Sequence, residues 1–305
     1  MAKYGIPYMG SKAKIADDIL AVLPSGKRFV DLFGGGFAMS HAALLSGKYE
    51  QVFYNELNPL LPQLIKDAIA GKYANERRWI SREDFFRLKD TDGYVKYIWS
   101  FGNGGKEYLF GKDKEAAKKL GHDYVCFGKD IQGVPNIAYT DMRTRRLYLQ
   151  WFIKKKTGKR YELQQLEWLQ RLQQLERLQQ LERLQRLEQL ERLQRLEQLE
   201  RLEINCGSYL DYQYRVGDVV YCDPPYENTK KYDKDGFDYK QFYDWVASRE
   251  YPVYFSSYEI SDKRFNVIWQ TEKLSLLNNS KATKKVVTEY LYCNKNTINL
   301  GPLFC

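Results

Sequence analysis

The residues best suited to chemistry lie together at 223–226, directly after the apolar stretch 219–222. They are Asp223, Pro224, Pro225 and Tyr226. Two prolines end a strand rigidly and leave their carbonyls available, because proline has no N–H. The Asp223 carboxylate and the Pro224 carbonyl could both accept from one exocyclic amino group, with Tyr226 stacked on its base. The alternative is a Pro-Pro turn with a capping Asp. It is the minor explanation, because four specified residues follow directly after the apolar stretch.

A second group combines three glycines with two carboxylates. Asp31 precedes the run 34–36 of glycines, and Glu56 follows about 20 residues later. Glycines at a strand-to-helix turn let a ligand approach the backbone, and a carboxylate after the next strand can accept both ribose hydroxyls. Each feature alone is more often a turn or a surface carboxylate. Their spacing across a strand–helix–strand unit makes a nucleoside site about equally plausible.

The elements that must position these residues alternate along the chain. We expect strands at 27–33, 51–56, 217–223, 251–257 and 264–277, with a last one at 284–294. Helical stretches lie between them at 37–45, 57–70 and 239–248. This alternation predicts an α/β fold with a doubly wound, Rossmann-like, mostly parallel sheet. Residues 76–162 break the pattern, since they are rich in glycine, lysine and aromatic residues, and indicate an inserted module.

A repeat fills 163–203, where leucine occupies every third position from 163 to 202. In an α-helix this period would wind the leucines around the whole surface, whereas a 3₁₀ helix would place them on one face. Slippage of a short DNA repeat explains the phase equally well. We expect a helical rod, with 3₁₀ slightly ahead of α and a tight solenoid third. Its leucine face would be buried against its own domain or a second copy, so self-association is possible.

Composition narrows the classes of function. The 305 residues carry a formal net charge of +9, and the repeat is nearly neutral, so the basic bias belongs to the rest of the chain. Such a balance favours polyanionic partners. No apolar run approaches the roughly 18 residues of a membrane span, and no signal peptide is expected. Five scattered cysteines indicate neither disulfides nor a metal site, so a reducing cytoplasm is the default. His41 and His122 have no partner in sequence and are interpreted as structural.

The order of these motifs resembles Dam-type DNA adenine-N6 methyltransferases of the D12 class and alpha group, over about 5–75 and 204–295. Tyr8 to Lys12 is similar to the family's aromatic-x-Gly-Gly-Lys segment. Asp31 to Phe37 is similar to its Phe-x-Gly-x-Gly loop, with Phe37 where the last glycine is usual. Softer similarities lie in Glu56-Leu57-Asn58 and in the segments 206–209, 255–258 and 284–289. The Asp-Pro-Pro-Tyr motif is the specific element.

The resemblance implies a domain organisation and a set of site residues. The catalytic domain would comprise 1–75 and 204–305, the target-recognition module 76–162 and the repeat insertion 163–203. The cofactor would be S-adenosyl-L-methionine. Its implied contacts are Tyr8, Lys12, Asp31, Phe33, Gly35, Glu56, Ser208, Tyr209 and Asp223. The catalytic set would be Asp223, Pro224 and Tyr226, without a metal.

The partner implied by the resemblance is double-stranded DNA. The segment 101–108 could form a hairpin, and basic side chains interleave with aromatic ones near 143–160. For any single basic run a solvated face is the usual explanation, but the collective charge favours phosphate contacts for some of them. The candidates are Asn103, Lys106, Arg143, Arg145, Arg146 and Lys284.

The implied reaction is methyl transfer to adenine N6 in double-stranded DNA, after the base has flipped out of the helix. Hydrogen bonds to Asp223 and the Pro224 carbonyl would localise the N6 lone pair. No Pro-Cys pair is present for cytosine C5 chemistry. A catalytically idle DNA-binding relative stays open, although intact Lys12, Glu56 and Tyr226 count against it. The same chemistry on cytosine N4 or RNA also stays open. A bacterial or phage-infected cell and a restriction–modification role fit the resemblance, whereas the target sequence, GATC or another, is not readable.

Overall fold

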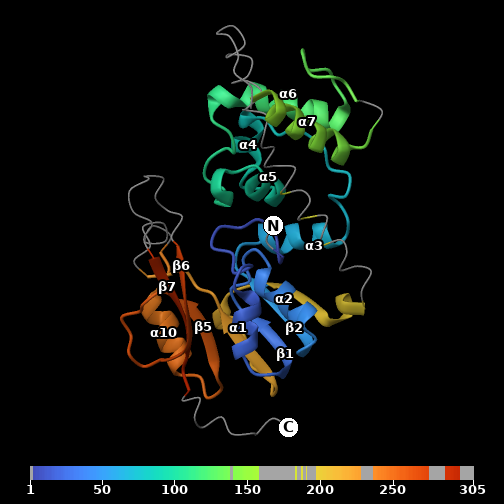
Figure 1. Cartoon of the computed structure of the whole chain (residues 1–305). Helices are drawn as coiled ribbons and strands as arrows, with labels where there is room; N and C mark the ends of the chain where they lie inside the picture. The colour runs from blue at the N-terminus through green and yellow to red at the C-terminus, as the bar shows by residue number, and fades with distance from the viewer. Residues whose placement is uncertain are drawn as a thin grey trace. The chain divides into compact units, whose positions relative to one another are not determined.

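The computed structural model describes residues 3–137, 140–157, 183, 187, 190, 197–227, 236–274 and 286–295. The chain divides into two compact units (Figure 1). Unit 1 contains Met1–Ile6, Gly10–Lys66 and Arg192–Cys305, and unit 2 contains Pro7–Met9 and Asp67–Glu191. In the part of the chain described, no helix has the length and apolar character needed to cross a membrane.

Unit 1 is built on one seven-stranded sheet with the strand order β3-β2-β1-β4-β5-β7-β6. Strands β1 to β5 are parallel, whereas β7 runs antiparallel to both of its neighbours. This confirms the predicted α/β class and its mostly parallel, Rossmann-like sheet. The strands are β1 Gly26–Asp31, β2 Tyr49–Glu56, β3 Leu202–Cys206, β4 Asp218–Cys222, β5 Val253–Ser257, β6 Asn266–Leu274 and β7 Val286–Cys293.

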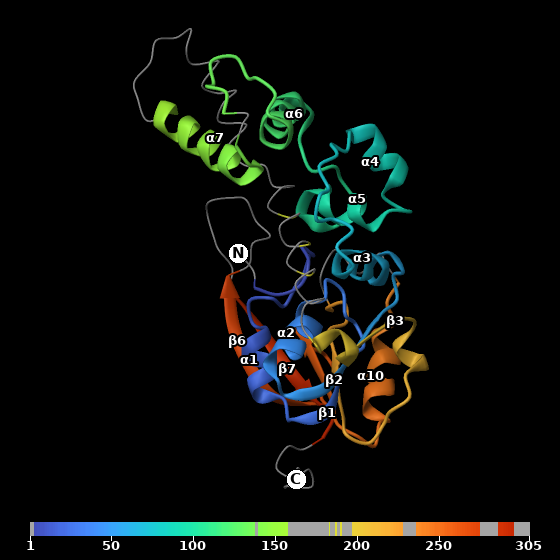
Figure 2. The same ribbon diagram turned by 90° about the vertical axis from the view of Figure 1, so that its right-hand side faces the viewer.

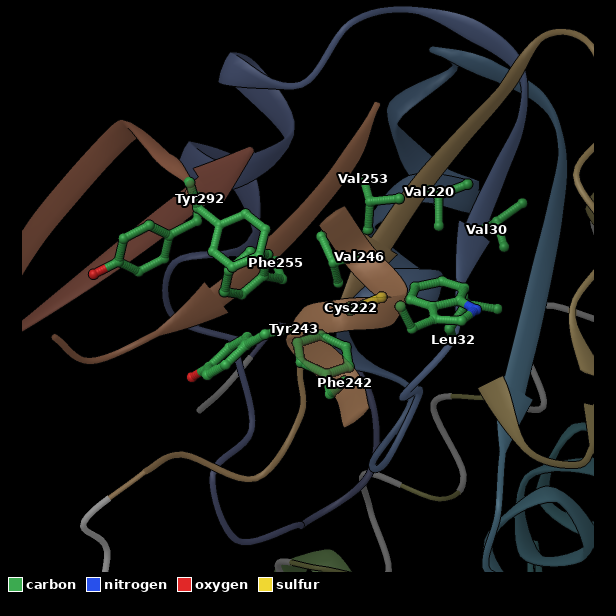
Figure 3. Packing of buried hydrophobic residues seen from close by; sticks show 12 residues of the cluster. Val30, Leu32, Val220, Cys222, Phe242, Tyr243, Val246, Val253, Phe255 and Tyr292 are labelled. Atoms are coloured by element: carbon green, nitrogen blue, oxygen red, sulfur yellow. The ribbon is translucent and has the colours of Figure 1, made fainter. Parts of the chain in front are cut away.

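Helices cover both faces of this sheet (Figure 2). Helices α1 Ala16–Val22 and α2 Ala38–Ser46 lie on one side, and α2 packs against β1 and β2. Helix α10 Tyr239–Ala247 covers the other side. Its Phe242 and Val246 join Val30, Val220 and Phe255 from the strands in a dry, aromatic-rich core (Figure 3). Each such side chain contributes roughly 1.5–3 kcal/mol by leaving water, which fixes α10 on the sheet.

The order of the strands reverses between β1 and β4. The chain leaves β1 towards β2 and β3, and then returns to place β4 on the other side of β1. At their amino ends the two strands are joined by Arg28 and Asp218, a buried pair with N–O distances of 2.9 and 2.8 Å. This pairing fixes the register Arg28↔Asp218 and therefore Asp31↔Tyr221. Ligands of open α/β sheets bind at the carboxyl ends of strands beside such a reversal.

Unit 2 is helical. It contains α4 Arg82–Leu88, α5 Gly93–Ile98, the 3₁₀ turn η1 Phe101–Asn103, α6 Lys112–Phe127 and α7 Met142–Thr157. Ser81 and Asp92 cap α4 and α5 by accepting backbone N–H groups of the first turn. The ring of Trp79 lies 5.0 Å from that of Trp99 and packs edge-on against it. Helix α3 Leu60–Ile69 spans the boundary between the two units as the chain is divided.

Most of the leucine repeat lies outside the described residues. Three of its interior positions are described, and Arg183, Leu187 and Leu190 are all α-helical rather than 3₁₀. Both leucines are fully buried. These two side chains are therefore not available to a second copy of the chain. Towards the end of the repeat come the 3₁₀ turn η3 Glu197–Arg201 and then β3, which begins at Leu202.

Phe37 has a backbone conformation that normally belongs to glycine. Its φ is 67° and its ψ 15°, and it immediately precedes α2. The side chain is fully buried, with its ring 5.8 Å from that of His41 and 5.5 Å from that of Tyr54. Phe37 thus keeps the backbone conformation expected of a glycine at this place and adds an aromatic ring to the core. The packing of that ring offsets the strain, which costs about 1–2 kcal/mol.

This balance predicts that glycine at position 37 gives a more stable protein than alanine, the reverse of the usual order. Phe37→Ala loses the ring and keeps the strain, so it should cost about 3–5 kcal/mol in the free energy of unfolding. Phe37→Gly loses the same ring but relieves the strain, and should be more stable than Phe37→Ala by about 1 kcal/mol. Urea unfolding of the three proteins measures both differences. An alanine variant at least as stable as the glycine variant would contradict this account.

Candidate active site

The carboxyl ends of β1 and β4 bring the two main sequence motifs together. Asp31 is the last residue of β1, and Asp223 follows the last residue of β4. Both side chains lie on the sheet face that α2 covers, because Asp31 pairs with Tyr221 and side chains alternate along a strand. The sequence predicted strands at 27–33 and 217–223, which contain these carboxylates, and the strand order makes the two strands neighbours.

Asp223 is held by a lysine from the other end of the sequence. The Lys12 ammonium lies 2.6 Å from Oδ1 and 2.6 Å from Oδ2 of Asp223. The Lys12 side chain is 5 % exposed and that of Asp223 is 20 % exposed. Two short, charge-assisted contacts to one carboxylate show that an N–H donor fits at this place. Of these two side chains, only that of Asp223 is appreciably exposed to solvent.

Tyr226 and Glu289 complete the cluster around Asp223. The Tyr226 hydroxyl lies 3.1 Å from Asp223 Oδ1 and 2.8 Å from Glu289 Oε1. Glu289 Oε1 is also 3.3 Å from the Lys12 ammonium, and its side chain is fully buried. Burial and the Asp223 charge raise the pKa of Tyr226 well above its usual value, so its hydroxyl keeps its proton. Glu289 was not among the site residues predicted from the sequence, although a charged residue within the apolar strand 286–293 was a signal.

The glycine turn is held by Glu56. Its two carboxylate oxygens accept from the backbone N–H groups of Gly35 and Asn58, each at 2.9 Å. Burial raises the pKa of Glu56, while these N–H groups act in the opposite direction. Gly34 must be glycine, because a Cβ atom there would lie 2.1 Å from the Tyr54 ring. Each oxygen of Glu56 keeps a second lone pair, so the carboxylate can still accept from a ligand's hydroxyls.

Asp31 is a buried carboxylate with one oxygen left over. Its Oδ2 accepts from the Ser40 hydroxyl at 2.7 Å, and its side chain is almost fully buried. Its Oδ1 has no hydrogen-bond partner among the described residues. Burial raises the pKa of Asp31 to about 7, and the nearby Asp223 and Glu56 charges act in the same direction. A cationic group beside Oδ1 would stabilise this carboxylate, which suits an ammonium-bearing ligand.

The remaining cofactor candidates lie at different places. Ser208 begins the 3₁₀ turn η4 Tyr209–Asp211 and accepts from the Leu210 N–H. The Tyr209 ring lies 5.1 Å from that of Phe33, so these two candidates are in contact. Ser208 and the β2 residue Asn55 line a pocket of about 350 Å³. Tyr8 belongs to unit 2, where its ring is 5.6 Å from that of Tyr97.

Among the DNA-contact candidates, the prediction for Arg145 is corrected by its buried position. It is 7 % exposed and donates to the carbonyls of Val125, Cys126 and Thr140, so it caps the end of α6 instead of facing a ligand. Its position within an exposed basic run concealed this role. Arg143 and Lys106 are exposed, and Arg146 is partly exposed. Lys284 lies outside the described residues.

The predicted hairpin at 101–108 is a short loop closed by one bridge. Ser100 and Tyr108 form an isolated antiparallel bridge, and the loop contains η1 in place of paired strands. Asn103 has a positive φ of 58° and donates to the Tyr97 carbonyl at 2.8 Å. Its side chain therefore holds the loop, which leaves Lys106 as the exposed polar candidate at this place.

Both histidines bind backbone groups. His41 accepts from the Gly5 N–H at 3.1 Å, which ties the N-terminal segment to α2. His122 Nε2 lies 2.9 Å from the Arg77 carbonyl, and burial lowers the pKa of this histidine. Within the described ranges, no three His, Cys, Asp or Glu side chains are grouped so that they could hold a metal ion.

The comparison with known families agrees with this geometry. A family model for the D12 class N6 adenine-specific DNA methyltransferase matches residues 8–274, which is most of the chain. No curated protein matches the chain. The matched region includes Lys12, the glycine turn, Glu56 and the Asp-Pro-Pro-Tyr motif. The chain therefore belongs to the D12 class of N6 adenine-specific DNA methyltransferases, enzymes that use S-adenosylmethionine as the methyl donor.

Proposed function

We propose that unit 1 methylates N6 of an adenine that has flipped out of double-stranded DNA, at sites of a specific sequence. The observation that carries this proposal is the Lys12 ammonium on both oxygens of Asp223. It marks a place where an N–H donor meets two acceptor atoms at the edge of the sheet. The exocyclic amino group of adenine is a donor of the same kind and can replace the ammonium there.

Asp223 and Pro224 would act on the nitrogen by hydrogen bonding. The N6 lone pair is delocalised into the ring, which makes N6 a poor nucleophile. Hydrogen bonds from both N–H groups, to the Asp223 carboxylate and the Pro224 carbonyl, would draw the nitrogen towards sp³ geometry and localise the pair. Preorganised acceptors supply the main part of such catalysis, together with positioning. The sulfonium of S-adenosylmethionine supplies the methyl group when it is bound.

Base flipping follows from how enclosed the cluster is. Asp223 is 20 % exposed, and Lys12 and Glu289 are 5 % and 0 % exposed, so the acceptor atoms open on one side only. An adenine stacked in a duplex cannot bring N6 to a carboxylate recessed in this way, whereas an extruded base can. The net charge of +9 supports attraction to the phosphate backbone.

The residues of unit 1 fit S-adenosylmethionine. Glu56 stands at the glycine turn with lone pairs for ribose hydroxyls, and Asp31 offers a buried oxygen without a partner among the described residues. Asp31 would bind the ammonium of the methionine part, which favours its ionised form. Lys12 and the turn from Gly34 to Phe37 would border the space between Glu56 and Asp31.

The Asp223 carboxylate is the proposed acceptor of the substrate amino group. Asp223→Ala removes the acceptor of the amino group and should lower single-turnover methylation by roughly two to three orders of magnitude. The assay is transfer of labelled methyl from S-adenosylmethionine to genomic DNA free of adenine methylation. Affinity for the cofactor, measured by calorimetry, should change much less.

The matched control is Asp244→Ala. Asp244 lies on α10, its side chain is 45 % exposed, and it pairs with Lys240, so activity should stay near that of the wild type. Near-normal methylation by Asp223→Ala would refute the catalytic assignment. Running RNA and DNA duplexes that contain only G·C pairs in the same assay separates the other acceptors.

The Glu56 carboxylate is the proposed acceptor of the ribose hydroxyls. Glu56→Ala should weaken cofactor binding by about 1–3 kcal/mol, because it removes a charged acceptor and frees the N–H groups of Gly35 and Asn58. Glu50→Ala, an exposed glutamate on the same strand, is the control. Calorimetry that finds equal affinities for both variants would place the ribose contact elsewhere.

The buried Asp31 carboxyl should make the stability of the protein depend on pH. The pKa of Asp31 is about 7 in the fold, above the 3.8 of an unperturbed aspartate, so the folded state retains a proton that the unfolded state gives up. Stability without ligand should therefore fall as the pH rises from about 4 to 7. Asp31→Asn should lessen this loss by a few kcal/mol at pH 8 and by about a third as much at pH 5. Urea midpoints at the two pH values measure it, with the exposed Asp211→Asn as control. Parallel pH profiles for wild type and Asp31→Asn would disprove it.

A further inference from the structure

The cluster around Asp223 contains two hydrogen-bond donors and two carboxylates. The donors are the Lys12 ammonium and the Tyr226 hydroxyl, and the carboxylates are Asp223 and Glu289. Each donor lies within reach of both carboxylates. The Lys12 ammonium is also 4.8 Å from the centre of the Tyr226 ring, so the four side chains form one contiguous group.

Each of the two donors lies closest to a different carboxylate. Lys12 is nearer to Asp223, at 2.6 Å, and farther from Glu289, at 3.3 Å. Tyr226 is nearer to Glu289, at 2.8 Å, and farther from Asp223, at 3.1 Å. A phenol has one proton to donate, so Tyr226 serves one carboxylate at a time. Small movements would therefore exchange the partners of the two donors.

The two carboxylates differ in access. Asp223 follows a strand at the open edge and is 20 % exposed, whereas Glu289 is fully buried. Glu289 reaches the cluster because β7 runs antiparallel, which places the first half of that strand beside the carboxyl end of β5, in the register Ser257↔Tyr290. A substrate amine can meet Asp223 but not Glu289. Any role of Glu289 in the reaction must act through Lys12 and Tyr226.

We propose that Glu289 is a positioning residue that takes over the Lys12 ammonium when Asp223 binds the substrate amine. The inference rests on the proposed methyl transfer at Asp223. As Lys12 moves to Glu289, Tyr226 turns its proton from Glu289 to Asp223 Oδ1. Asp223 then keeps one fixed hydrogen bond and has its remaining acceptor positions free for the amino group.

Glu289 is needed because the cluster is enclosed. An ammonium that leaves Asp223 without another charged acceptor would be buried and uncompensated, which is strongly unfavourable. Without the Glu289 charge, Lys12 would remain on Asp223 and compete with the substrate. The competition occurs after DNA has bound, so it should lower the rate constant at saturating DNA and leave DNA and cofactor affinities nearly unchanged.

The test is a cycle of four proteins: wild type, Glu289→Gln, Lys12→Met and the double variant. We expect Glu289→Gln to lower the single-turnover rate constant at saturating DNA by about 10- to 100-fold. The half-saturating DNA concentration and the cofactor dissociation constant should change by less than about 3-fold. In the Lys12→Met background the same substitution should change the rate by less than about 3-fold, since no ammonium needs a second acceptor. Equal losses in the two backgrounds would overturn the proposal.

One further variant and one further comparison cover other outcomes. If Lys12→Met is inactive, Glu289→Asp replaces it, because it keeps the charge and should recover most of the rate that Glu289→Gln loses. Equal rates for Asp and Gln would then reject the role. If Glu289→Gln does not fold, the double variant is compared with Lys12→Met, and a further loss of rate counts against the proposal. An inactive wild type would refute the proposed function itself, whereas an active wild type with an unaffected Glu289→Gln would refute only this inference.

Discussion

Compensation of charge in an enclosed space is the constraint on which the active edge of unit 1 depends. One ammonium stands between two carboxylates, and all three side chains are largely withdrawn from water. No two of the three come from neighbouring parts of the sequence. Lys12 precedes the first strand, Asp223 follows β4, and Glu289 lies on β7. The strand order and the reversed direction of β7 bring them together, so the chemistry depends on the topology of the whole sheet.

The part of the same edge that we propose for the cofactor is organised in advance by the chain itself. Glu56 fixes the turn through backbone N–H groups, and Phe37 supplies the positive φ at which α2 begins. The strain at Phe37 is tolerated because its ring fills the core beside Tyr54. A turn that is already shaped loses little entropy when a ligand binds. The strained backbone at Phe37 and the packing of its ring therefore both hold the glycine turn in one shape.

Sequence reasoning recovered the elements whose signals are local. The strand expected at 217–223 is found at Asp218–Cys222, and the helix expected at 239–248 at Tyr239–Ala247, because an apolar run and an amphipathic period are local patterns. The sequence did not predict which groups the side chains would contact. Arg145 looked like part of an exposed basic run, and Glu289 like an ordinary strand residue. Their roles are set by carbonyls and charges contributed by other elements, which no short window of sequence contains.

The division of unit 1 into two stretches of sequence has a consequence for synthesis. The first stretch provides β1 and β2, and the chain must then pass through all of unit 2 before β4 can pair with β1. Pairings so distant in sequence form late, since the long intervening loop must close first. On the ribosome the carboxylate pair assembles only after residue 289 has been made. Nascent and truncated chains that end earlier therefore lack the complete group of Lys12, Asp223 and Glu289 at this edge.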